Sequence, residues 1–109
     1  FADKHDRHHA PAINAGPVVK HNANHRYTTE GISTAEFALL CEKADVTPQH
    51  FVNRADLRCG STVGPMLASR LGITAIDIGN PMLSMHSARE QGGTHDHAPM
   101  VRVMRQFLA

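Results

Sequence analysis

Ile73-Thr-Ala-Ile-Asp-Ile78 is an apolar run that predicts a buried strand, and it breaks off into Gly79-Asn80-Pro81, which is typical of a loop. Gly72 directly precedes the run and predicts the end of a helix at that point. A helix that passes straight into a buried strand is typical of α/β domains, in which helices alternate with parallel strands. This stretch therefore decides the expected fold class, which is α/β.

A second set of signals predicts an amphipathic helix upstream of this run. Ser33-Thr-Ala-Glu36 has the spacing of a capping box, in which the two end residues satisfy each other's free backbone donors. Ile32 and Phe37 have the spacing of a hydrophobic staple around that box. An apolar face follows at helical intervals, formed by Phe37, Leu40, Cys41 and Ala44. We expect this helix to end within residues 45–48.

The other predicted elements complete an alternating order. Strands are expected near 17–24 and 50–54, and a helix is expected with Pro65 in its first turn. Asp96 or His97 opens a last helix, whose apolar face would comprise Met100, Met104, Phe107 and Leu108. The order β-α-β-α-β-α predicts right-handed crossovers between parallel strands, and hence a three-layer α/β/α arrangement with a mostly parallel sheet.

Three strands are few for a sheet, and their apolar edges would need a cover. The chain also begins at Phe1 rather than at methionine. We therefore expect residues 1–109 to be one part of a larger domain.

Composition and charge argue against several classes of partner. Hydrophobic residues make up 41% of the chain and charged residues 19%, as in soluble globular proteins. With histidines neutral the net charge is +1, so no electrostatic feature favours nucleic acid or an anionic membrane. No signal segment or membrane-spanning apolar stretch is evident in the sequence. Cys41 and Cys59 lack CxxC spacing and are expected to be free thiols, compatible with a cytoplasmic protein.

Histidine is the residue type that most suggests chemistry, since it occurs nine times. His86 follows the predicted strand at 73–78, and loops beyond the carboxyl ends of strands gather ligands and catalytic groups. It is a candidate metal ligand or acid–base group, although a single loop histidine is more often structural and a zinc site needs about three protein ligands. The amino-terminal loop offers further ligands without fixed geometry, which seldom hold a metal: Asp3, His5, Asp6, His8 and His9.

Two other features are candidates for binding an anion. Lys20 lies on a short predicted strand; as an edge residue it would simply face water, which the pattern favours, or its ammonium would meet a substrate carboxylate. The small-residue loop Cys59-Gly60-Ser61-Thr62 leads into a helix start, where free N–H groups favour a carboxylate, a carbonyl oxygen or a phosphate. It is not a P-loop, and helix capping by Ser61 or Thr62 would explain the same residues.

Taken together, several segments resemble the carboxyl-terminal part of the aspartyl aminopeptidases, a family of two-metal exopeptidases. The segments follow the family's order and span nearly the whole chain. The most specific is Pro81-Met-Leu-Ser-Met-His-Ser87 within 79–90. The others are Asp3-Lys-His-Asp6, Gly16-Pro-Val-Val-Lys20, Asn22-Ala-Asn24 with Arg26-Tyr27, residues 56–64 around Cys-Gly-Ser-Thr, and Ala68-Ser-Arg-Leu-Gly-Ile73.

The resemblance implies a zinc-dependent aminopeptidase that removes Asp or Glu from the amino termini of peptides, acting as a cytoplasmic homo-oligomer. His86 matches the family's last metal ligand. Lys20 and Tyr27 match residues that hold the substrate, and a lysine suits an acidic side chain or carboxylate. Cys59, Gly60, Ser61 and Thr62 would line the same pocket. His25 stands where glutamine is common in the family.

The resemblance also implies that most of the catalytic machinery lies elsewhere. The other ligands of the two metals, a bridging aspartate and the glutamate acting as general base would precede Phe1, so no catalytic residue is expected within residues 1–109. These residues would then be a carboxyl-terminal segment of the catalytic domain, inactive alone. Two alternatives stay open: a non-catalytic fragment that serves assembly or peptide binding, and a small anion- or nucleotide-binding domain that uses the Cys59–Thr62 loop.

Overall fold

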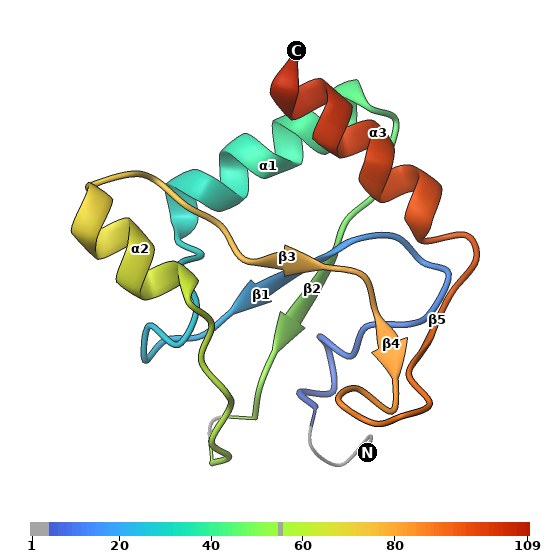
Figure 1. Ribbon diagram of the computed structural model, residues 1–109, viewed down its shortest axis with the longest axis horizontal. Helices are drawn as coiled ribbons and strands as arrows, with labels where there is room; N and C mark the ends of the chain where they lie inside the picture. The colour runs from blue at the N-terminus through green and yellow to red at the C-terminus, as the bar shows by residue number, and fades with distance from the viewer. Residues whose placement is uncertain (1–4, 55) are drawn as a thin grey trace.

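The computed structural model describes residues 5–54 and 56–109 (Figure 1). Helices and strands alternate through most of this part of the chain, which confirms the α/β class. Their order is β1 (Val18–His21), α1 (Gly31–Lys43), β2 (Gln49–Val52), α2 (Gly64–Leu71), β3 (Ile78–Gly79), β4 (Met82–Leu83), β5 (Gln91–Gly92) and α3 (His97–Leu108).

The main sheet has the strand order β2-β1-β3, so β1 is its central strand. β1 and β2 are parallel, with Val19 opposite His50, as predicted. β3 is antiparallel to β1, with Val18 opposite Gly79, so the expectation that the third strand is parallel is wrong. β4 and β5 form a separate antiparallel pair.

The predicted strand at 73–78 is also wrong over most of its length. β3 contains only Ile78 from that run, and Ile73 is 53% exposed. The physical reason is Asp77, a charged residue whose side chain and main chain are engaged by hydrogen bonds to other segments rather than by a long strand ladder.

The helices begin and end near the residues that the capping, proline and glycine signals predict, except that α1 begins earlier. α1 starts before the predicted cap: Glu30 is the N-cap, and its N–H donates to Ser33 Oγ at 3.0 Å, so Ser33 closes the box with Glu30 rather than with Glu36. Ile32 is 66% exposed, which is incompatible with the predicted staple. Pro65 lies in the first turn of α2.

The ends of α2 and α3 lie near the predicted points. Gly72 ends α2 in the left-handed conformation at φ 64°, which glycine adopts without strain. Asp96 is the N-cap of α3. The apolar face predicted for α3 is wrong in part, because Val103 is its buried residue whereas Phe107 and Leu108 are 67% and 80% exposed.

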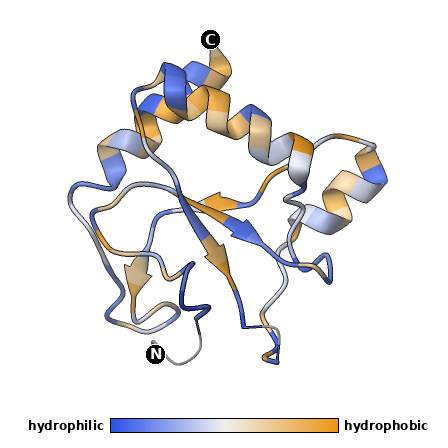
Figure 2. Ribbon diagram, turned by 180° about the vertical axis from the view of Figure 1, so that it is seen from behind, coloured by the Kyte–Doolittle hydropathy of each residue, from blue (hydrophilic) through white to orange (hydrophobic). Residues whose placement is uncertain are grey.

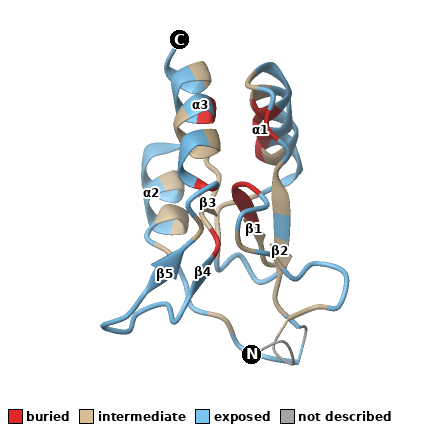
Figure 3. Cartoon of the chain, turned by 90° about the vertical axis from the view of Figure 1, so that its right-hand side faces the viewer, coloured by how far each residue is buried: buried red, intermediate tan, exposed pale blue. Residues whose placement is uncertain are grey.

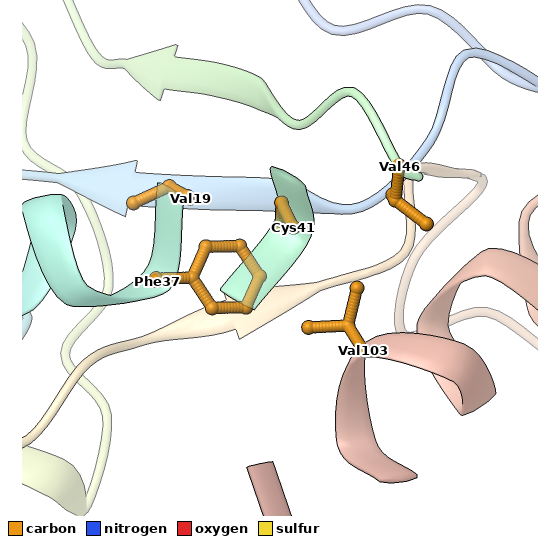
Figure 4. Packing of buried hydrophobic residues seen from close by; sticks show 5 residues of the cluster. All are labelled: Val19, Phe37, Cys41, Val46 and Val103. Atoms are coloured by element: carbon orange, nitrogen blue, oxygen red, sulfur yellow. The ribbon is translucent and has the colours of Figure 1, made fainter. Parts of the chain in front are cut away.

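A small core lies between the sheet and the two helices α1 and α3, which lie side by side on one side of it (Figure 3). Phe37 and Cys41 are buried in this core as predicted, with Leu40 and Ala44 packed against it. Val19, Val46 and Val103 complete the buried cluster (Figure 4). A second helical layer across the sheet is not seen in the described residues, so the three-layer arrangement stays a prediction.

The segment before β1 is fixed to the start of α3 by one buried carboxylate. Asp96 is fully buried and accepts hydrogen bonds from the backbone N–H groups of Asn14 at 2.8 Å and Gly16 at 2.9 Å. Gly16 has φ 100°, and a Cβ there would lie 2.5 Å from the Thr47 carbonyl oxygen, so only glycine fits. None of the helices in the described part of the chain is long and apolar enough to cross a membrane.

Candidate functional site

Lys20 is held at the centre of the sheet rather than at an edge, so its interpretation as a solvated edge lysine is wrong. Its N–H donates to the Asp77 carbonyl at 2.9 Å, which extends the pairing of β1 with β3. Its side chain passes over Gly79, where a Cβ would lie 3.6 Å from Cε and 3.8 Å from Nζ. The ammonium lies 5.8 Å from the centre of the Tyr27 ring, within the range of a cation–π interaction.

Asn22 shapes the hydrophilic turn that follows β1 (Figure 2). Its Oδ1 accepts hydrogen bonds from the N–H groups of Asn24 at 2.9 Å and Arg26 at 3.4 Å, while its Nδ2 donates to Cys59 Sγ at 3.0 Å. The left-handed backbone of His25, at φ 53°, completes the turn. These contacts bring Tyr27 back toward Lys20 and fix the turn to the Cys59 loop.

The Cys59–Thr62 loop lies against the same turn. The Arg26 carbonyl accepts hydrogen bonds from Thr62 N–H and Ser61 Oγ, both at 3.2 Å. Ser61 and Thr62 do not cap α2, because its N-cap is Val63 and has no side-chain cap bond. The capping explanation for this loop is therefore wrong. Gly60 is exposed, with no atom of another segment within 4 Å of a Cβ built there.

Asp77 joins these segments beneath the site. Its Oδ2 accepts hydrogen bonds from Thr28 N–H at 2.7 Å, Thr28 Oγ1 at 2.9 Å and Thr62 Oγ1 at 3.0 Å. Sequence reasoning missed Asp77 and the role of Asn22. The available signal was that Asp77 is the charged residue within an apolar run, because a half-buried carboxylate needs hydrogen-bond donors.

Tyr27 is half-buried, and its surroundings keep its hydroxyl protonated. Burial is the main cause that raises the pKa of Tyr27, and the neighbouring Cys59 thiol and Asp77 carboxylate raise it further. A hydroxyl that resists ionisation remains a hydrogen-bond donor over a wide pH range. Beside the Lys20 ammonium, it gives the site one cation and one neutral donor.

His86 lies in the loop of residues 84–90 between β4 and β5, beyond the carboxyl end of β3 as predicted. Its backbone is left-handed at φ 67°, and its N–H donates to the Glu90 carboxylate. The hairpin lies at the other end of the sheet from the turn after β1 (Figure 1). Among the described residues, no group of three or more His, Cys, Asp and Glu side chains is placed to hold a metal.

Several other histidines make contacts that sequence reasoning did not foresee. His5 packs edge to face on Phe51 with ring centres 5.5 Å apart, and His9 pairs with Asp6 at 2.9 Å. Asp3, from the same candidate metal cluster, lies outside the described residues. His21 Nε2 and His50 Nδ1 are 2.9 Å apart, and burial and the neighbouring His50 lower the pKa of His21.

A mostly apolar groove lies away from Lys20 and Tyr27. It measures about 300 Å³ and runs between α1, α3 and residues 74–78. Its lining is mostly apolar and includes Phe37, Ile76 and Phe107. It adjoins the core and offers few of the polar groups that a polar substrate needs.

The chain has close relatives among proteins of known sequence. The sequence profile of the aminopeptidase I zinc metalloprotease family, M18, matches residues 1–108. Over all 109 residues the chain is 49% identical to a probable M18 family aminopeptidase 2 of Pseudomonas aeruginosa (strain UCBPP-PA14) and 50% identical to one of Pseudomonas syringae pv. syringae (strain B728a). The chain spans 25% of the length of each of these relatives.

Solved structures similar to this chain also point to this family. The fold matches a chain in the cryo-EM structure of the Ape4 and Nbr1 complex with a TM-score of 0.95 at 42% identity, over 98% of this chain and 20% of that one. It matches the crystal structure of prApe1 with a TM-score of 0.94 at 31% identity, over 99% of this chain and 23% of that one. The family resemblance inferred from the sequence motifs is thereby confirmed, and the chain belongs to the aminopeptidase I zinc metalloprotease (M18) family.

Proposed function

We propose that this chain is the carboxyl-terminal segment of the catalytic domain of a zinc aminopeptidase, and that the enzyme removes Asp or Glu from the amino termini of peptides. The observation that carries the acidic preference is the position of the Lys20 ammonium, over Gly79 and beside the Tyr27 ring. Membership of the M18 family and relatives that are aminopeptidases support the peptidase activity.

The burial and charge of Lys20 suit it to bind a substrate carboxylate. It is partly buried, and within residues 5–54 and 56–109 no carboxylate forms an ion pair with it. A cation that has lost part of its hydration gains from an anionic partner more than an exposed lysine does. The acidic side chain of a substrate's first residue is a partner of the right charge.

Tyr27 and the Cys59–Thr62 loop would form the walls around that carboxylate. The neutral Tyr27 hydroxyl would donate a hydrogen bond to a substrate oxygen, either in the peptide backbone or at the carbonyl under attack. Gly60 and Ser61 are exposed, which leaves the loop accessible to a ligand.

The residues present fit the family's zinc only in part. The exposed His86 imidazole would supply one ligand through a ring nitrogen, and its main chain is already fixed by Glu90. When bound, zinc supplies Lewis acidity at the scissile carbonyl and acidifies the attacking water. The family resemblance implies that the remaining ligands and the general base would come from residues upstream of this segment, and the described residues hold no group of three or more ligands.

Two further properties belong to the proposal. A homo-oligomeric enzyme is supported by the yeast mApe1 dodecamer, which matches this chain with a TM-score of 0.79 at 28% identity, over 99% of this chain and 23% of that one. A cytoplasmic location is compatible with the two free cysteines.

The test is Lys20→Leu in the full-length enzyme, assayed on aspartyl and alanyl substrates that are otherwise identical. We expect the ratio of kcat/KM for aspartyl over alanyl to fall by about 10- to 100-fold, the usual contribution of a hydrogen bond to a charged group. Lys43→Leu is the matched control, because Lys43 is an exposed lysine in the last turn of α1. An unchanged ratio in Lys20→Leu would refute the acidic preference assigned to this site.

A further inference from the structure

Asp77 has an unusual concentration of hydrogen bonds on one atom. Its Oδ2 accepts from Thr28 N–H, Thr28 Oγ1 and Thr62 Oγ1, at 2.7, 2.9 and 3.0 Å. The donors come from two segments far apart in sequence, one that follows Tyr27 and one that ends the Cys59–Thr62 loop. Hydrogen bonds to a carboxylate are stronger than those between neutral groups, so this oxygen fixes both segments at one point.

The main chain of Asp77 fixes a third segment. Its carbonyl accepts the Lys20 N–H at 2.9 Å, and its N–H donates to Thr29 Oγ1 at 3.0 Å. The same residue therefore holds Lys20 on one side and the segment 27–29 on the other. The relative position of Lys20 and Tyr27 depends on this arrangement.

The surroundings of the carboxylate leave little room for adjustment. A Cβ at Gly64, the first residue of α2, would lie 3.1 Å from Asp77 Oδ2 and 3.1 Å from Thr28 Cγ2. The first turn of α2 thus closes against the hydrogen-bonded group. Such close packing limits how far the half-buried carboxylate can move away from its three donors.

From this geometry we infer that Asp77 is the positioning residue of the substrate site: its carboxylate fixes the Tyr27–Thr29 segment against the Cys59–Thr62 loop, so that Tyr27 meets the Lys20 ammonium. The kinetic part of this inference rests on the proposed function. Asp77 acts through Tyr27 and the loop, and it is not assigned a contact with substrate.

Asp96 provides a matched control for a purely structural role. Its carboxylate also accepts several hydrogen bonds, in this case from the backbone N–H groups of Asn14 and Gly16, and the residue is fully buried. It fixes the segment before β1 to α3 rather than any residue of the site. Its loss should lower stability without changing how the site is arranged.

The first experiment measures the arrangement without using activity. In the full-length protein, Asp77→Ala should increase the rate of iodoacetamide labelling of Cys59 several-fold, as read by mass spectrometry of its peptide. The reason is that the loop loses the Thr62 bond that holds it. Asp96→Ala should leave Cys59 labelling unchanged. Equal labelling of wild type and folded Asp77→Ala would overturn the inference.

The second experiment measures substrate selectivity. Asp77→Ala should lower the aspartyl-over-alanyl ratio of kcat/KM by about tenfold, whereas Asp77→Asn, which keeps an acceptor oxygen, should recover most of it. Asp96→Ala should leave the ratio intact. If Asp77→Ala does not fold, Thr28→Val and Thr62→Val each remove one hydroxyl donor at nearly constant shape and should increase Cys59 labelling.

The two readouts separate the two proposals. Faster Cys59 labelling in Asp77→Ala together with an unchanged ratio in Lys20→Leu would support the positioning role and refute the acidic preference. A ratio that falls in Lys20→Leu, with both readouts unchanged in Asp77→Ala, would support the acidic preference and refute the positioning role.

Discussion

Tyr27 combines a half-buried side chain with a hydroxyl that resists ionisation. Burial chiefly raises the pKa of its hydroxyl, and Cys59 and Asp77 add to that shift. Because the folded state disfavours the phenolate, this residue's contribution to stability is complete below the ordinary tyrosine pKa of about 10 and is lost as pH rises through the raised value.

Removing the Cys59 thiol should move the Tyr27 pKa back toward its ordinary value, but only in part. Cys59 is the second cause of the shift, and burial, which is the first, remains in Cys59→Ala. The pKa can be followed by the ultraviolet absorbance of the phenolate, as the difference between each protein and the same protein carrying Tyr27→Phe. Cys41→Ala removes a buried core thiol and serves as the control. An identical titration in wild type and Cys59→Ala would contradict the contact.

The sequence identified the residues of the candidate site, but it did not identify the contacts that hold these residues in place. The family motifs pointed to Lys20, Tyr27 and the Cys59–Thr62 loop, and the structure places them together. Pattern alone assigned Lys20 to solvent, because the strand that pairs with β1 on that side lies far along the chain. Asp77 was missed for the same reason, since its partners are remote in sequence.

At the level of elements, the first turn of α2 packs closely against Asp77 and Thr28. Gly64 begins this helix, and a side chain there would crowd Asp77 and Thr28. The need for glycine at this position comes from space alone. Alanine would otherwise favour the helix, since glycine is the poorer helix former by about 1 kcal/mol.

Gly64→Ala should therefore lower the free energy of unfolding by about 1–2 kcal/mol, because the crowding of a packed site exceeds the gain in helix propensity. Urea unfolding of the full-length protein measures the change. Gly31→Ala is a close control, because Gly31 also begins a helix and nothing lies within 4 Å of a Cβ there. It should be neutral or stabilising. Equal stability of Gly64→Ala and Gly31→Ala would contradict the packing argument.

Local signals predicted the helices well and the sheet less well. Pro65 and Gly72 delimit α2 because backbone sterics act within the element itself. The start of α1 was placed too late because Ser33 fits two capping arrangements, and the observed one uses Glu30 on its other side. The direction of β3 depends on which strand it meets, a choice that no short stretch of sequence contains.

At the scale of the whole molecule, many large apolar side chains lie outside the small core and remain exposed. Phe107 and Leu108 of α3 are 67% and 80% exposed, and a groove of about 300 Å³ lies open between α1, α3 and residues 74–78. Exposed apolar area of this kind is typical of a surface that packs against further structure. The relatives of this chain are about four times its length, which is consistent with additional protein over these helices.

The isolated 109-residue chain should bind no stoichiometric zinc and hydrolyse no aspartyl substrate, whereas the proposed function predicts that the full-length enzyme does both. A catalytic zinc needs about three protein ligands, and the described residues of this chain contain no group of three or more. Metal analysis and an aspartyl assay on both proteins, purified in parallel, measure the difference. Circular dichroism must first establish that the isolated chain is folded. Tight zinc binding by the folded isolated chain would place the ligands within residues 1–109, and the upstream origin assigned to them would then be wrong.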